Sequence, residues 1–443
     1  MKRRSGEDPH TNFWTLPQPF LQPLPRSPHK NLKNSSFLTL TIISSTIKGM
    51  SNIPPSILAK CGRDLHRKPN HPIQIIAKLV TDYFATLERD FEVFDDLDHK
   101  VSTVNNFDRL LIPSDHPARS KSDTYYFDDE TVLRTHTSAH QTELLEDGHT
   151  SFLVVGDVYR KDEIDRTHYP VFHQIEGVHI FEDDLSEEDM TKDLIDVLKG
   201  LCGALFPDCE VRTADDYFPF THPSFEIEVL HKGEWIEILG CGIVQPLIIK
   251  SCVMENRKLM RTNGDLKKGW AFGIGLDRLA MILFKIPDIR LLWVDDPKFL
   301  SQFEDGKITQ FVSYSSLDPI TKDISFWIPE EQIEIEDVTA TKTIQNTVES
   351  EKYREHYYWK SENDAMDLIR DTANEHYPDI IESVVLFDQF EHPKTNKLSR
   401  AYRFKFSVSD PNMNNSSEFN RICNELHTKI AHVLTENLGV TIR

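Results

Sequence analysis

Residues 151–159 read SFLVVGDVY and residues 171–181 read VFHQIEGVHIF, with a polar loop, 160–170, between them. Each run is apolar and rich in β-branched residues, which favours a strand. Two successive strands joined by a hairpin loop predict an antiparallel pair. Because side chains alternate along a strand, Phe172, Gln174 and Glu176 point to the same face.

Neighbouring segments extend this sheet and cover it. Runs 225–230 and 234–239 pair across Lys232-Gly233, and 269–285 (GWAFGIGLDRLAMILFK) passes from a glycine-interrupted strand into an apolar helix. Apolar residues at helical spacing predict a helix of about 17 residues with Asn70 as its cap, and a second helix begins at Ser186. The first folded unit is therefore predicted to be α+β, an antiparallel sheet flanked by helices.

A second unit is predicted after a boundary near residue 310. The elements expected are a strand at 323–328, a helix at 362–377, strands at 381–390 and 401–408, a helix at 417–438 and a possible last strand at 440–443. The order β-α-β-β-α-β is the ferredoxin-like pattern. Residues 329–351 are acidic and Thr-rich, which favours a solvated insertion. The expected domains are 1–49, 50–309 and 310–443.

Charge is distributed unevenly along the 443 residues. The formal net charge is −21, which argues against a chain that coats nucleic acid with its whole surface. Residues 1–63 nevertheless hold nine Lys/Arg and only Glu7 and Asp8, with many Ser and Thr. This composition is typical of an organelle transit peptide. A disordered Pro-rich tail, or an extension ahead of a second start at Met50, are the alternatives.

Two features that the sequence lacks limit the class of protein it can encode. No apolar run approaches the length of a membrane span, so a soluble mature protein is expected. The six cysteines form no C-x-x-C pair, which favours a reducing compartment and argues against a structural zinc site.

Polar residues on apolar elements point to a ligand-binding face. An amide and a carboxylate beside Phe172 on one strand face are costly to bury without partners, although an exposed sheet face would also explain them. Arg278 stands on a very apolar helix and Arg160 ends a strand, so the two suit a polyphosphate; a structural ion pair is the alternative for Arg278. Gly273 and Gly275 would let a flat ligand lie on the backbone.

Four motifs in order carry a resemblance to a known family. They are VVGDVYR (154–160), FHQIEG (172–177), FPFTHPS (218–224) and GWAFGIGLDR (269–278). From about Asn70 to the end, the chain resembles the phenylalanyl-tRNA synthetases of class II, and most closely their single-chain mitochondrial form. The resemblance implies a class II synthetase sheet followed by a ferredoxin-like anticodon-binding domain.

The resemblance also implies roles for individual residues. ATP would be held by Arg160, Asp162, Phe172, Gly273 and Arg278; Arg160 would take the α-phosphate, Arg278 the γ-phosphate and Phe172 the adenine. Asp162 stands where the family usually has Glu. Phenylalanine would be bound by His136, Ser138, Gln141, Gln174, Glu176, Phe218, Phe220, Glu237 and Phe272. The tRNA acceptor end would meet Arg166 and His168. A basic, aromatic segment, HPKTNKLSRAYRFKF (392–406), would grip tRNA through Lys394, Lys397, Arg400 and Arg403.

The implied reaction joins phenylalanine to tRNA(Phe) for mitochondrial translation, in the matrix, through a phenylalanyl-adenylate made from ATP with Mg²⁺. The resemblance further implies a monomer, because the anticodon domain is carried in the same chain. Two rival hypotheses remain: a catalytically idle synthetase-like tRNA-binding protein, and a class II ligase for another amino or carboxylic acid. Amino-acid-dependent ATP–pyrophosphate exchange separates them.

Overall fold

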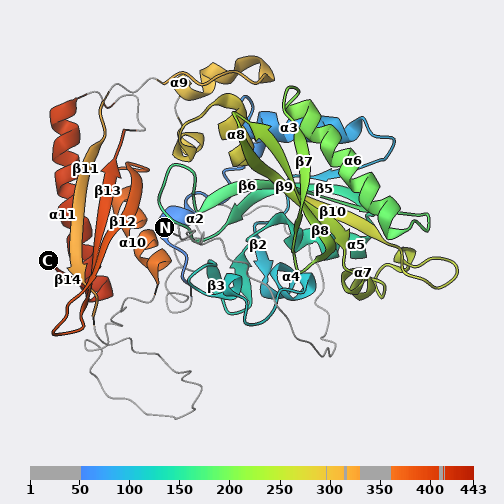
Figure 1. Cartoon of the computed structure of the whole chain (residues 1–443), viewed down its shortest axis with the longest axis horizontal. Helices are drawn as coiled ribbons and strands as arrows, with labels where there is room; N and C mark the ends of the chain where they lie inside the picture. Colours follow the sequence, from blue (N-terminus) through green and yellow to red (C-terminus); the bar gives the residue numbers. More distant parts are fainter. Residues whose placement is uncertain (1–50, 296, 314–316, 330–360, 409–412, 414) are drawn as a thin grey trace, which may run out of the picture.

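A computed structural model describes residues 51–295, 297–313, 317–329, 361–408, 413 and 415–443. The predicted targeting segment 1–49, and all but the first residue of the acidic segment 329–351, lie outside these residues. Two sheets, each with its own hydrophobic core, organise the described chain (Figure 1).

The larger sheet has seven strands in the order β1-β5-β6-β10-β9-β8-β7. β1 runs parallel to β5 and all other neighbours are antiparallel. Its strands are β1 Glu92–Phe94, β5 Ser151–Tyr159, β6 Val171–Ile180, β7 Val211–Asp216, β8 Thr221–His231, β9 Glu234–Val244 and β10 Gly269–Gly275. The predicted antiparallel sheet is thus confirmed, with β8 and β9 longer than expected. β10 lies at its centre, with β6 and β9 on either side.

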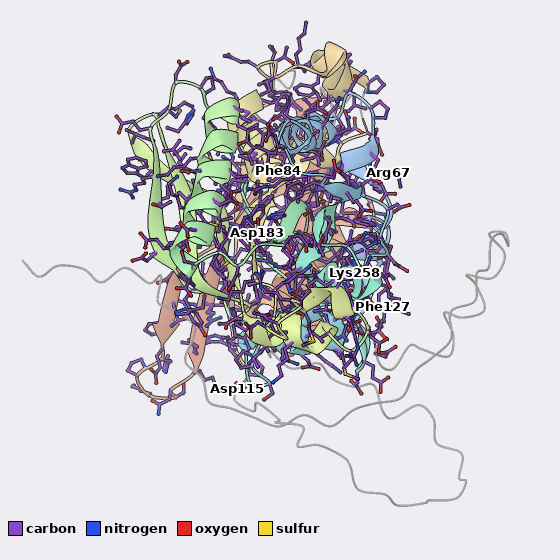
Figure 2. The ribbon with its side chains drawn as sticks, turned by 90° about the vertical axis from the view of Figure 1, so that its right-hand side faces the viewer. Arg67, Phe84, Asp115, Phe127, Asp183 and Lys258 are labelled. Carbon is purple, nitrogen blue, oxygen red and sulfur yellow. The ribbon has the colours of Figure 1, made fainter. Side chains whose placement is uncertain are left out.

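Helices cover the two faces of this sheet unequally. One face packs against α3, α6 and α8 along its length, and Phe84 of α3, labelled in Figure 2, stacks on Phe272 with ring centroids 5.0 Å apart. The other face is covered at one end by α5 and α7. These helices are α3 Pro72–Ala85, α5 Gln141–Asp147, α6 Glu187–Leu205, α7 Pro246–Cys252 and α8 Leu276–Phe284.

Short elements complete the first domain. A three-stranded sheet, β2-β4-β3, comprises β2 Lys100–Ser102, β3 Tyr126–Asp128 and β4 Thr131–Leu133. The short helices are α2 Pro55–Leu58, α4 Thr103–Asn106 and α9 Pro297–Leu300. Among the described helices, none combines the length and the apolar character that crossing a bilayer requires.

Helix caps follow the predictions in one case and not in the other. The Ser186 side chain accepts from the Asp189 N–H, as expected for the cap of α6. For α3 the predicted cap Asn70 is wrong: Asn70 has a positive φ of 62°, and the ring of His71 accepts from the Ile73 N–H.

The second domain has the ferredoxin-like order that the sequence predicts. Its sheet runs β12-β13-β11-β14, and α10 and α11 pack on one face of it. The elements are β11 Ile320–Trp327, α10 Glu362–Asn374, β12 Ile381–Glu391, β13 Leu398–Phe406, α11 Ser416–Leu438 and β14 Thr441–Ile442.

The loop between β5 and β6 joins the two domains. Ile164 belongs to the core of the second domain, and its carbonyl accepts from the Val384 N–H at 2.8 Å. Lys161, almost fully buried, pairs with Asp364 at 2.7 Å and Asp367 at 3.5 Å. The second domain therefore packs directly on the loop that follows β5.

Candidate active site

A row of polar side chains crosses the open part of the large sheet. Phe172, Gln174 and Glu176 of β6 alternate with buried neighbours and are each partly exposed. Glycines face them on β10: Gly273 pairs with Glu176 and Gly275 with Gln174. A Cβ at Gly273 would lie 3.2 Å from Cγ of Glu176, so glycine keeps the floor beside the carboxylate open.

A loop over this row presents polar atoms without protein partners. Among the described residues, at least one ring nitrogen of His136, Nε2 of Gln141 and Oε1 of Gln174 are buried and make no hydrogen bond. Buried polar groups are normally paired, because each unpaired one costs about 1–3 kcal/mol. A set of them at one place indicates a site for a polar ligand.

The protonation states suit recognition of an ammonium group. Desolvation raises the pKa of Glu176 to about 7, although a hydrogen bond with Ser138 and the charge of Arg160 oppose the shift. Desolvation, followed by the charge of Arg160, lowers the pKa of His136 to about 3. His136 is therefore neutral at physiological pH, and Glu176 readily becomes an anion when a cation arrives.

An aromatic pocket adjoins this polar row. Phe218 and Phe220 lie just before β8. Their rings stack with centroids 5.8 Å apart and an angle of 13° between the ring planes. Phe218 lies over Gly240, where a Cβ would come within 2.6 Å of its ring. Gly240 in turn pairs with Gly273 of β10. Glycines on two adjacent strands thus place a flat apolar wall next to Glu176.

Arg160 stands at the opposite end of the polar row. Its Nε donates to the Thr135 carbonyl at 2.8 Å, and its Cζ lies 5.3 Å from the ring centroid of Phe172. Although the residue keeps solvent-exposed surface, desolvation lowers its pKa, while Glu176 and Asp162 oppose the shift. The cation is therefore held over the same strand face and remains accessible.

Arg278 at the start of α8 is loosely paired. Its Nη1 lies 3.8 Å from Oε2 of Glu237, and the two side chains are 64% and 50% exposed. An ion pair this long and this exposed contributes little to stability. The structural ion pair that the sequence left open for Arg278 does exist, with Glu237. Because the pair is long and exposed, the guanidinium stays available to bind an anion.

Glu237 reaches Arg278 because of a β-bulge. Strict alternation along β9 would put Glu237 on the same face as Leu239, but β8 and β9 shift register so that Ile227 pairs with Leu239 and Glu228 with Glu237. The extra residue, Ile238, turns Glu237 to the open face while Leu239 stays in the core.

The chain is similar in sequence to proteins of known family. Residues 58–303 match the family model described as the tRNA synthetases class II core domain (F). The chain is 41% identical over 402 residues to a chloroplastic/mitochondrial phenylalanine–tRNA ligase of Arabidopsis thaliana, covering 89% of this chain and 83% of that protein. It is 38% identical to a mitochondrial phenylalanine–tRNA ligase of Mus musculus, covering 88% of this chain and 85% of that protein. The chain belongs to the class II phenylalanine–tRNA ligase family.

A bacterial member of the family matches about half of the chain. The phenylalanine–tRNA ligase alpha subunit of Acinetobacter baylyi is 37% identical over 250 residues, which is 55% of this chain and 69% of that subunit.

One residue expected in the ligase's amino-acid site lies elsewhere. Phe272 is 3% exposed and points to the helix-covered face, where it stacks on Phe84 and covers Gly177. Its expected substrate contact is wrong because alternation along β10 sends Ala271 and Gly273, not Phe272, to the open face.

The expected tRNA-binding residues do not form one surface. Arg166 donates to Glu382 of β12 at 2.5 Å, and His168 pairs with Asp165 at 2.7 Å, which raises its pKa to about 9. Arg166 therefore binds the second domain, whereas His168 is held by a residue of its own loop.

The basic segment 392–406 is divided between two faces of the small sheet. Arg400 pairs with Glu362 of α10 at 3.1 Å, on the helix-covered face, so the cations of the segment do not all lie on one face. Arg403 faces the other way and pairs with Asp323 at 2.8 Å. Lys394 and Lys397 are exposed in the β12–β13 hairpin.

Several site residues were missed by sequence reasoning. Arg134, Thr137 and Ala271 gave no signal of their own, and of the three only Ala271 lies within a quoted motif. Glu226, next to Glu237, has a pKa raised by desolvation and by the Glu237 charge. Only the strand register brings that second carboxylate to the open face.

Proposed function

We propose that this chain activates phenylalanine with ATP, forming phenylalanyl-adenylate and pyrophosphate, and then transfers phenylalanine to tRNA(Phe). The observation that carries the proposal is the junction between the unpartnered polar atoms around Glu176 and the stacked Phe218–Phe220 wall. A free amino acid with a phenyl side chain presents its ammonium group to the polar atoms around Glu176 and its ring to the Phe218–Phe220 wall.

The first step needs no general base, because the attacking carboxylate of phenylalanine is already an anion. It displaces pyrophosphate at the α-phosphorus of ATP, with Arg160 over the α-phosphate and Arg278 at the far end of the triphosphate. These two cations neutralise developing charge, and the glycine-lined floor aligns the reactants. In the second step a terminal ribose hydroxyl of tRNA attacks the adenylate carbonyl.

The carboxylates of Glu226 and Glu237 fit Mg²⁺ bound together with the triphosphate. Hard oxygen ligands suit Mg²⁺, which is usually held by one or two carboxylates and substrate phosphates. The described residues hold no cluster of three or more potential ligands, which is compatible with that mode. When bound, the ion would supply further charge neutralisation to ATP.

The tRNA would contact the second domain at one end of its sheet. Rings of Trp327 and Phe390 lie 6.3 Å apart there, and Cζ of Arg443 stands 5.5 Å from the Trp327 ring. Aromatic rings beside cations suit unstacked bases. The proposed surface consists of Trp327, Phe390, His392, Lys394, Lys397, Arg403 and Arg443.

We place the enzyme in the mitochondrial matrix as a monomer. The mitochondrial relatives and the basic, hydroxyl-rich composition of residues 1–49 support this location. The direct test is aminoacylation of a mitochondrial tRNA(Phe) transcript with labelled phenylalanine, for wild type and Arg160→Ala. We expect charging by wild type and a loss of at least about a hundredfold in the variant. An idle tRNA-binding protein would bind the transcript and charge nothing.

A further inference from the structure

Arg134 is a buried cation that no part of the proposed reaction uses. Its side chain is only 2% exposed and pairs with Asp157, 3% exposed, at 2.8 Å. Its Nε also donates to the Asp157 carbonyl at 2.7 Å, and Nη1 donates to the Leu97 carbonyl at 3.1 Å. Burying a guanidinium costs several kcal/mol unless its donors are satisfied, so this position is specific to arginine.

The same guanidinium closes the amino-acid-binding loop. The loop of residues 135–141, which carries His136, Ser138 and Gln141, starts directly after Arg134. Near its end, Nε2 of His140 lies 3.1 Å from Nη1 of Arg134. Because an arginine has no acceptor, His140 accepts through Nε2 and keeps its proton on Nδ1, which faces Glu143 at 3.4 Å. One side chain thus ties the end of the loop to its beginning.

The neighbouring strand makes room for this contact. Gly156 of β5 pairs with Gln174 of β6, and a Cβ at residue 156 would overlap the Arg134 guanidinium. The guanidinium therefore lies against the strand pair that carries Gln174. A shift of Arg134 would move the loop relative to the polar row.

We propose that Arg134 and His140 form a positioning pair that holds the unpartnered atoms of the 135–141 loop at the amino acid. Neither side chain contacts the substrate. The inference rests on the proposed function in one respect, which is that the ligand bound at the loop is an amino acid. It assigns the pair to amino-acid binding, not to ATP binding or to folding alone.

Three variants test the pair by ATP–pyrophosphate exchange, with whichever amino acid the wild type activates. His140→Leu removes the acceptor at similar volume, His140→Gln keeps a polar group near Nε2, and Gly156→Ala displaces the guanidinium. We expect His140→Leu and Gly156→Ala to raise KM for the amino acid about tenfold, with KM for ATP within about threefold of wild type. His140→Gln should recover most of the loss.

A matched control separates positioning from stability. Arg290 is also buried and pairs with Asp288, but it lies outside the site. Arg290→Leu should lower the melting temperature without moving KM for the amino acid. The proposal is overturned if KM for both substrates rises together, if His140→Gln is as impaired as His140→Leu, or if Arg290→Leu reproduces the effect. A wild type that activates no amino acid would instead refute the proposed function.

Discussion

Phenylalanine activation should depend on pH through Glu176. Desolvation holds the pKa of this carboxyl near 7, against an ordinary value of 4.5, so about 3 kcal/mol disfavours its anion in the free enzyme. The amino group of phenylalanine stays protonated between pH 6 and pH 8. The ammonium group therefore meets a charged Glu176 in about one molecule in ten at pH 6, and in about nine of ten at pH 8.

The expected result is a kcat/KM for phenylalanine that rises about tenfold from pH 6 to pH 8 with an apparent pKa near 7. Pyrophosphate exchange at saturating ATP and low phenylalanine measures it, because kcat/KM reports the free enzyme. Glu176→Gln is the matched control: it keeps the shape, cannot titrate, and should give a lower and flat profile.

Two results would refute this reasoning. A wild-type profile that is flat between pH 6 and pH 8 would mean that Glu176 is already ionised in the free site. A Glu176→Gln variant that retains the same rise would assign the titration to another group. The stability effect has the opposite sign: a carboxyl whose pKa is raised on folding makes the folded state less stable as pH rises from about 4.5 to 7.

Three further predictions follow from packing and specificity. Gly273→Ala should raise KM for phenylalanine about fivefold, because its Cβ would press on Glu176, whereas Gly203→Ala, with open space around it, should change nothing in the same exchange assay. Asp277→Ala should lower the free energy of unfolding in urea by about 2–3 kcal/mol, since Asp277 accepts from the buried His173 N–H; a loss under about 0.5 kcal/mol would contradict the contact. Tyrosine should be activated about a hundredfold less efficiently than phenylalanine, and complete rejection of tyrosine would contradict an apolar ring pocket.

Local patterns predicted the strands and the central site residues. The alternation of Phe172, Gln174 and Glu176 follows from chain geometry alone, so it survives any arrangement of the rest of the fold. The same holds for the boundaries of β5 and for the Ser186 cap of α6. The motif FPFTHPS (218–224) also predicted the aromatic wall, because Phe218 and Phe220 lie close together in sequence.

Contacts between distant segments could not be predicted in this way. The bulge at Ile238 depends on how β9 pairs with β8, and no single-strand pattern reveals an extra residue. The carboxylate partners of Arg166 and Arg400 come from segments 216 and 38 residues away. Phe272 was misassigned because its motif was taken as a unit, whereas neighbours in a strand face opposite ways.

Amino-acid-dependent ATP–pyrophosphate exchange with all twenty amino acids, each added singly to the purified chain, tests the central claim most directly. We expect exchange with phenylalanine, a far weaker signal with tyrosine, and none above background with the others. Exchange driven by a different amino acid, or the absence of exchange with phenylalanine, would contradict it.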